Sequence, residues 1–133
     1  MNATTSKVGV WSEAGRLRRV LVCAPGLAHQ RLTPETCKDL LFDDVIWMQQ
    51  ARRDHFDFVA KMVDRGVEVL DLQDLLTEVV AVPESRDWVL DRKITDGQVG
   101  SGFTHEIRAW LGELPADRLA DFLIGGVTSS DVP

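Results

Sequence analysis

The 133-residue sequence lacks several features that would assign it to a class at once. It has no apolar run approaching the ~18–20 residues of a membrane-spanning helix, and its first ten residues lack the apolar segment of a secretory signal. Its two cysteines, Cys23 and Cys37, form no CxxC pair. We therefore expect a cytosolic (cytoplasmic) protein with reduced thiols and no membrane partner.

Basic residues are also few, since 15 Lys and Arg stand against 21 Asp and Glu, for a net charge of −6. Nucleic-acid binders usually show a basic stripe, so this balance argues against a nucleic-acid partner. The three histidines, His29, His55 and His105, lie far apart and have no cysteine or carboxylate at the spacing of metal ligands. No glycine-rich phosphate loop follows a strand. We expect no metal site.

The first half of the chain predicts a strand, a connector, a helix and a second strand. The expected elements are a strand over 16–26, a loop after it, a short helix over 33–41 capped by Thr33, a long helix over 45–65 ended by Gly66, and a strand over 67–72. Cys23 lies among apolar residues of the first strand, which favours a buried side chain over a nucleophile. This order of elements is typical of an α/β fold.

The second half predicts helices only, with breaks at Pro83 and Pro115 and a cap at Thr104. We therefore divide the chain into a strand–helix–strand module over residues 1–74 and an all-α unit over 75–133. Because two strands make a poor sheet by themselves, we expect either that a partner completes the sheet or that the chain is truncated.

The segment RLTPETCKDLLFDDVIWMQQ (31–50) places two adjacent carboxylates, Asp43 and Asp44, among apolar residues that read as buried. These apolar residues are Leu40, Leu41, Phe42, Val45, Ile46 and Trp47. A charge buried without a partner costs several kcal/mol, so something must meet the two acids. The residues leave two interpretations open. One acid is solvated and the other caps a backbone amide, or both lie at the mouth of a site for a guanidinium or ammonium group.

Four segments resemble the N-terminal part of bacterial arginine deiminase. They are GVWSEAGRLRRVLVCAPG (9–26), HQRLTPETCKDLLFDDVIW (29–47), ARRDHFDFVAKMVDRGVEVLDL (51–72) and LIGGV (123–127). The resemblance implies hydrolysis of L-arginine to L-citrulline and ammonia, without a metal or an organic cofactor. It also implies the five-bladed α/β propeller of the guanidine-modifying (pentein) superfamily. Residues 1–74 would then form the first module, and residues 75–133 part of an inserted helical domain.

The same resemblance assigns the catalytic groups to positions outside this segment. The family uses a cysteine nucleophile near its far C-terminus, a histidine base, and acids that hold the guanidinium. Neither Cys23 nor Cys37 matches the nucleophile motif, so we expect no catalytic residue here and no activity from the chain alone. What carries over is the loop LLFDD, which lines the substrate entrance. Leu41 matches the position near the guanidino group, and Asp43 and Asp44 belong to the same motif.

Two further hypotheses remain beside this one. The chain could be a self-sufficient interaction or regulatory module that reuses the fold, or part of another guanidine-modifying enzyme, such as an amidinotransferase or a dimethylargininase. A fragment with one module leaves sheet edges and apolar faces unpaired, so we expect self-association, as a homo-oligomer. A self-sufficient module would instead be a cooperatively melting monomer or closed dimer.

Overall fold

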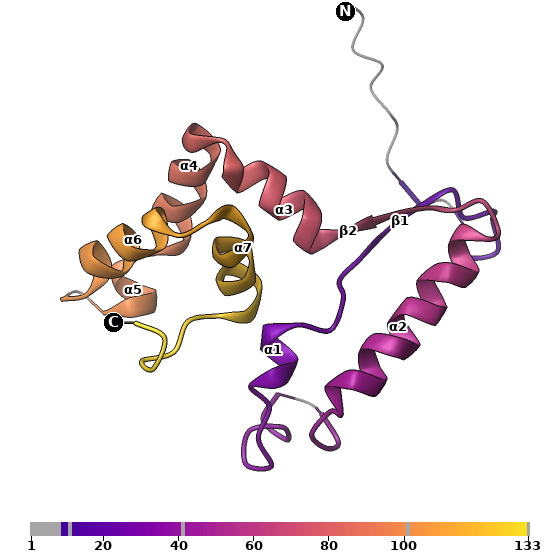
Figure 1. Cartoon of the computed structure of the whole chain (residues 1–133), viewed down its shortest axis with the longest axis horizontal. Helices are drawn as coiled ribbons and strands as arrows, with labels where there is room; N and C mark the ends of the chain where they lie inside the picture. The colour runs from indigo at the N-terminus through magenta and orange to yellow at the C-terminus, as the bar shows by residue number, and fades with distance from the viewer. Residues whose placement is uncertain (1–8, 11, 41, 101, 133) are drawn as a thin grey trace, which may run out of the picture.

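The computed structural model describes residues 9–10, 12–40, 42–100 and 102–132. Its elements are β1 (Arg19–Val22), α1 (Leu27–Gln30), α2 (Met48–Val63), β2 (Glu68–Asp71), α3 (Leu72–Ala81), α4 (Pro83–Lys93), α5 (Asp96–Val99), α6 (Thr104–Glu113) and α7 (Ala116–Gly125). Helices α3 to α7 gather on one side, α2 stands on the other, and the two strands lie between them (Figure 1). The described chain is thus mixed α/β and mostly helical.

The two strands form a parallel pair in which Arg19 lies opposite Glu68 and Val22 opposite Asp71. The order strand, helix, strand is therefore confirmed, although both strands are shorter than predicted. Each strand has one neighbour within the described residues, and the ladder pairs Arg19–Val22 with Glu68–Asp71. Because β1 ends at Val22, Cys23 lies past the ladder and is exposed, so the prediction of a buried Cys23 was wrong.

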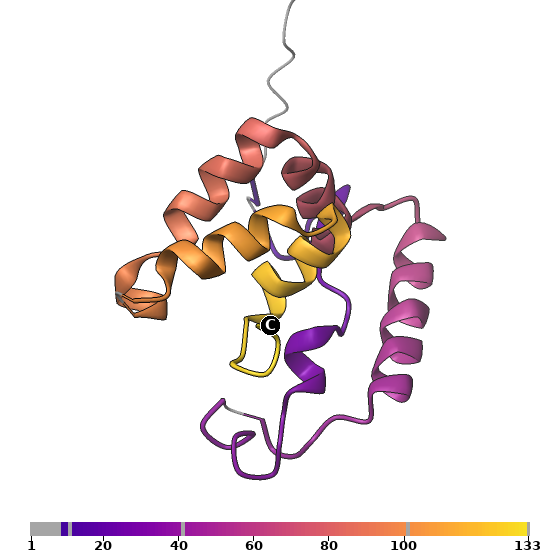
Figure 2. The ribbon, with the colours of Figure 1, turned by 60° about the vertical axis from the view of Figure 1, so that its left-hand side comes forward.

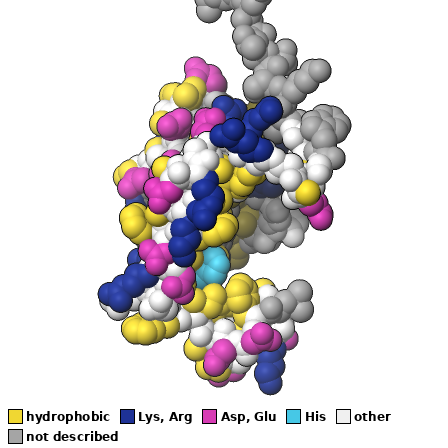
Figure 3. Space-filling model, turned by 90° about the vertical axis from the view of Figure 1, so that its right-hand side faces the viewer, with side chains coloured by type: hydrophobic (Ala, Val, Ile, Leu, Met, Phe, Trp, Pro, Cys, Tyr) yellow, Lys and Arg dark blue, Asp and Glu magenta, His cyan; other side chains and the backbone are white. Residues whose placement is uncertain are grey.

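Helix α2 confirms the predicted long helix, which begins at Met48 rather than near Val45. It ends before Gly66, whose φ of +73° lies in the left-handed region that suits glycine after a helix. Met62 is buried, whereas three other apolar side chains of α2 are exposed, namely Phe56, Phe58 and Val63. Seen from the side on which α2 lies in Figure 1, hydrophobic side chains stand among charged ones on the surface (Figure 3).

The connection between β1 and α2 differs from the prediction. Residues 34–40 form turns and not the short helix expected over 33–41, and a helical turn, α1, occurs in the predicted loop instead. Thr33 Oγ1 accepts from the Thr36 amide at 3.2 Å, the bond expected of a cap, but no helix follows it. The Phe42 amide then donates to the Cys37 carbonyl at 2.8 Å. This wider bond closes the segment as a turn, because an α-helix needs successive bonds to the fourth residue before.

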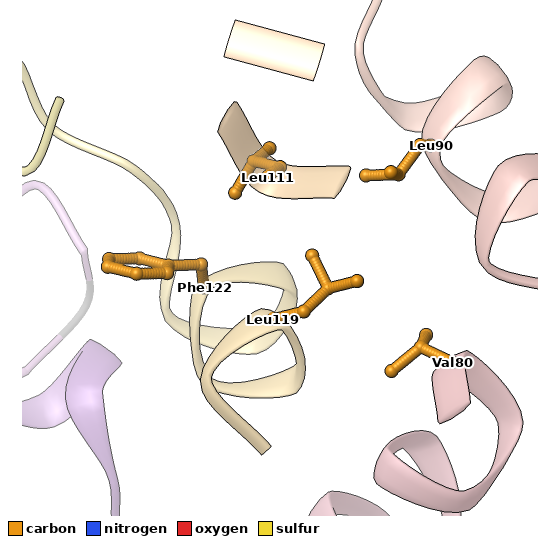
Figure 4. Packing of buried hydrophobic residues seen from close by; sticks show 5 residues of the cluster. All are labelled: Val80, Leu90, Leu111, Leu119 and Phe122. Atoms are coloured by element: carbon orange, nitrogen blue, oxygen red, sulfur yellow. The ribbon is translucent and has the colours of Figure 1, made fainter. Parts of the chain in front are cut away.

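Helices α3 to α7 confirm the prediction that the second half is helical. Asp71 caps α3 by accepting from the Gln73 amide at 2.7 Å, and Pro83 opens α4. Thr104 is the first residue of α6 and not its cap, which is Phe103. The side chains of the core come from α3, α4, α6 and α7: Val80, Leu90, Leu111, Leu119 and Phe122 (Figure 4). No helix in the described ranges has the length and apolar character needed to cross a membrane.

Candidate functional site

The candidate site is the segment Phe42–Trp47, here called the acidic loop, which connects the turns after α1 to α2. Asp43 and Asp44 form a bend in it, and both are exposed. Leu41 lies outside the described residues. The connection from α1 to α2, which contains the loop, lies at the end of the molecule remote from α4 (Figures 1 and 2).

Both carboxylates are open to solvent, and that of Asp44 also accepts from a backbone amide. Asp44 Oδ1 accepts from the amide of Val45 at 2.7 Å, and the ion pairs found in the described ranges use other acids. The prediction that the flanking residues are buried was wrong for those that the structure describes, because Leu40 is 58% exposed, Val45 44% and Trp47 69%, while Phe42 and Ile46 are only half-buried. No charge is therefore buried here, and both carboxylates are accessible to a cationic group.

The base of the loop is held by contacts with α1 and the turns. The Phe42 ring packs edge-on against the His29 ring with centroids 6.0 Å apart. Cys37, whose carbonyl accepts from the Phe42 amide, is buried, and so is Leu32. The residue immediately before the acid pair is therefore fixed to α1, while the acids themselves project to solvent.

Arg31 connects α1 to the end of the helical unit. Its Nη1 donates to the carbonyl oxygens of Gly125, at 3.1 Å, and Gly126, and its Nη2 lies 2.6 Å from Asp131 Oδ2. Sequence reasoning gave Arg31 no role. Its partners lie 94 to 100 positions away, so no local pattern identifies them.

The two cysteines remain poor candidates for a nucleophile. Partial desolvation of the exposed Cys23 thiol, followed by the negative charge of Asp71, raises its pKa, which disfavours the reactive thiolate. Cys37 is buried, and its Sγ donates to the carbonyl of Pro34 at 3.4 Å. As for metals, the part of the chain that the structure describes contains no group of three or more His, Cys, Asp or Glu side chains placed to hold an ion.

Two hollows lie beside these elements. One, of about 440 Å³, lies between α2 and the carboxyl ends of the strands, and Val22, Arg52, His55 and Asp71 are among its lining residues. The other, of about 880 Å³, is a mostly apolar groove between the helices and the C-terminal segment, with Phe103 and Val127 in its walls. Neither hollow is lined by Asp43 or Asp44.

Fold and site together define the class: a mixed α/β protein with a parallel strand–helix–strand unit, an exposed acidic loop after the first strand, and a helical unit that follows the second strand. The family model described as arginine deiminase matches residues 38–133, which include the acidic loop, α2, β2 and the helical unit. The chain belongs to the arginine deiminase family.

Proposed function

We propose that this chain is the N-terminal part of an arginine deiminase, which hydrolyses L-arginine to L-citrulline and ammonia. In this proposal the acidic loop borders the substrate entrance, with Leu41 near the guanidino group and Asp43 and Asp44 on the rim. The family match over residues 38–133 is the observation that carries the proposal, because it extends across the loop as well as the helices. The exposure of both carboxylates adds to this support.

The chemistry of the loop suits a guanidinium substrate. Arginine carries a planar cation that carboxylates bind through paired hydrogen bonds. Two accessible carboxylates raise the local concentration of such a cation and orient it before it enters. The cysteine nucleophile, the histidine base and the acids that hold the guanidinium would come from other parts of the enzyme. This chain alone is then inactive.

The parallel pair β1–β2 with α2 would form the first module of the five-bladed α/β propeller, over residues 1–74. Residues 75–133 would belong to the inserted helical domain. The paucity of buried side chains in the first module supports this assignment, since the fully buried core side chains come from the helices after β2. A sheet of two strands needs further elements to cover it.

The test is co-expression of the chain with the remainder of a bacterial arginine deiminase, followed by measurement of citrulline. We expect activity in the co-purified complex. Asp43→Asn and Asp44→Asn should each raise the KM for arginine by about fivefold, which corresponds to about 1 kcal/mol. The matched control is Asp57→Asn, an exposed acid of α2 outside the loop. If the KM of the co-purified complex were the wild-type value in all three variants, the role of the loop would be contradicted.

Self-association is a second part of the proposal. Phe56, Phe58 and Val63 of α2 and Leu21 of β1 are exposed on more than one face of the module, and burial of such apolar surface in a contact with another chain favours association. Sedimentation velocity of the chain alone should show oligomers. These oligomers should be absent when the chain is co-expressed with the remainder of the enzyme, because the remainder covers the same surface. A monomer at all concentrations would instead favour a self-sufficient interaction module.

A further inference from the structure

Arg31, Gly125, Gly126 and Asp131 form a contact set, here called the Arg31 joint, that connects segments remote in sequence. One guanidinium group donates from Nη1 to both glycine carbonyls and from Nη2 to the Asp131 carboxylate. The side chains of Arg31 and Asp131 are each 22% exposed, so the pair is largely shielded from solvent. Charged hydrogen bonds in such surroundings are stronger and more selective in geometry than exposed ones.

Each partner of Arg31 is itself held in place. Gly125 ends α7, where carbonyl groups have no partner within the helix and attract a cation. Gly126 has a φ of +78°, which turns the chain away from the helix axis. Asp131 Oδ2 also accepts from the amide and the hydroxyl of Thr128, both at 2.7 Å. The positions of these three acceptor groups are therefore determined by contacts that do not involve Arg31.

The joint is connected to the acidic loop through α1 and one aromatic contact. Arg31 directly follows α1, and His29 of that helix packs on Phe42. Phe42 is the neighbour of Asp43. Figure 2 shows α1 beside the C-terminal segment, on the way from the helical unit to the connection that holds the loop. A displacement of Arg31 would thus be transmitted to the acid pair through α1 and Phe42.

We infer that Arg31 is a positioning residue that fastens the acidic loop to the end of the helical unit. The helical unit thereby fixes the location of Asp43 and Asp44. The effect of this fastening on substrate rests on the proposed function, whereas the fastening itself does not. In the enzyme, the helical unit would then affect the KM for arginine through the position of the acidic loop.

The direct test is hydrogen exchange of backbone amides in the 133-residue chain. Arg31→Ala should accelerate exchange of the hydrogen-bonded amides within residues 33–47, those of Thr36, Cys37, Leu40 and Phe42, by about tenfold or more, because it lowers the free energy of local opening there. Exchange in α4 and α6 should change less than about twofold. The matched control, Arg108→Ala, removes an arginine that pairs with Asp87 and Asp91 inside the helical unit, and it should leave residues 33–47 unchanged. Acceleration spread over all helices, or absent from 33–47, would overturn the inference.

A milder variant keeps the test decisive if Arg31→Ala unfolds the chain. Asp131→Asn retains an acceptor but removes the charge, so it should accelerate exchange in 33–47 by a smaller factor and in the same residues. Arg31→Lys, which keeps the charge but not the fork of donors, should restore part of the protection. No change in 33–47 with Asp131→Asn, together with no rescue by lysine, would also overturn the inference.

The co-expressed enzyme separates this inference from the proposed function. Arg31→Ala should raise the KM for arginine with little change in kcat, since it displaces the loop and not the reacting groups. Faster exchange in 33–47 with an unchanged KM would support the Arg31 joint but refute the role of the loop at the substrate entrance. An unchanged exchange rate would refute the joint whatever the KM.

Discussion

The side chain of Leu27 lies directly against the α-carbon of Gly125. A Cβ placed on that glycine would be 2.6 Å from Cβ and 2.8 Å from Cγ of Leu27. Real Cβ atoms essentially never approach so closely, so the contact between α1 and α7 requires the missing side chain. The same contact brings the residues before the acidic loop to the end of the helical core.

Gly125→Ala should therefore lower the free energy of unfolding by about 1–3 kcal/mol, because the added methyl group overpacks the contact with Leu27. Gly112→Ala is the matched control. Gly112 lies in α6, and the nearest atom to its added Cβ is Leu90 Cδ1 at 3.9 Å, an ordinary contact. Alanine there should stabilise the helix by about 0.5–1 kcal/mol. Urea unfolding of both variants measures the difference, and equal midpoints would contradict the packing described here.

Arg86 closes the ends of two helices. Its Nε donates to the Val80 carbonyl at 2.8 Å, and its Nη1 donates to the carbonyls of Gly112, at 2.8 Å, and Leu114, at 2.9 Å. The carbonyls of Val80 and Gly112 belong to the last turns of α3 and α6, where intrahelical donors are lacking, and Leu114 is the C-cap of α6. One side chain thus satisfies acceptors on both helices around the core.

Arg86→Ala should lower the free energy of unfolding by about 2–3 kcal/mol, because it leaves these half-buried acceptors without a charged donor. Arg108→Ala is the comparison, since Arg108 pairs with the exposed carboxylates of Asp87 and Asp91 and should contribute only about 0–1 kcal/mol. Denaturant unfolding followed by circular dichroism distinguishes the two. A larger loss for Arg108→Ala than for Arg86→Ala would contradict this assignment.

The sequence predicts well what depends on nearby residues. The apolar spacing of α2, Pro83 at the start of α4 and Gly66 after α2 are signals read within a few positions, and these elements formed as expected. The helix expected over 33–41 did not form, although Thr33 makes the side-chain bond expected of a cap, because that bond does not determine whether the following backbone bonds continue.

Contacts over long sequence separations could not be predicted in this way. The role of Arg31 depends on Asp131 and on a helix end that the fold brings to it. The burial of the apolar residues beside Asp43 and Asp44 was overestimated because it, too, depends on contacts with remote parts of the chain. Apolar residues such as Trp47 read as core from composition, but whether they are covered depends on which elements pack on them. The assignment of Leu41, Asp43 and Asp44 to the substrate entrance stays a prediction.

Asp131 should make the free energy of unfolding depend on pH in the acidic range. The hydroxyl and the amide of Thr128, and then the charge of Arg31, lower the pKa of this carboxyl below its ordinary value. A depressed folded pKa stabilises the protein above the unfolded value of about 3.9, and this contribution is lost as the pH falls through the folded pKa. The stability difference between wild type and Asp131→Asn should therefore be full at pH 6 and shrink below about pH 4. A difference that stays constant over this range would contradict the coupling.

Cys23 should react slowly for an exposed thiol. Desolvation and the charge of Asp71 raise its pKa, so alkylation by iodoacetamide should rise at a higher pH than for free cysteine. Cys37 should react more slowly still, because it is buried. Asp71→Asn keeps a residue that can cap α3 while removing the charge, and it should move the alkylation of Cys23 to lower pH. Mass spectrometry of each peptide follows the two sites, and an unchanged pH profile in the variant would exclude Asp71 as a cause.

The chain belongs to the arginine deiminase family, and we propose that the reacting groups of the enzyme lie outside it. The most direct test of this proposal is citrulline formation from L-arginine by the purified chain, with a full-length family member assayed alongside and a thiol alkylator as control. The account predicts no citrulline from the chain while the full-length enzyme is active. Alkylator-sensitive citrulline from the chain alone would contradict it, because Cys23 or Cys37 would then be the nucleophile.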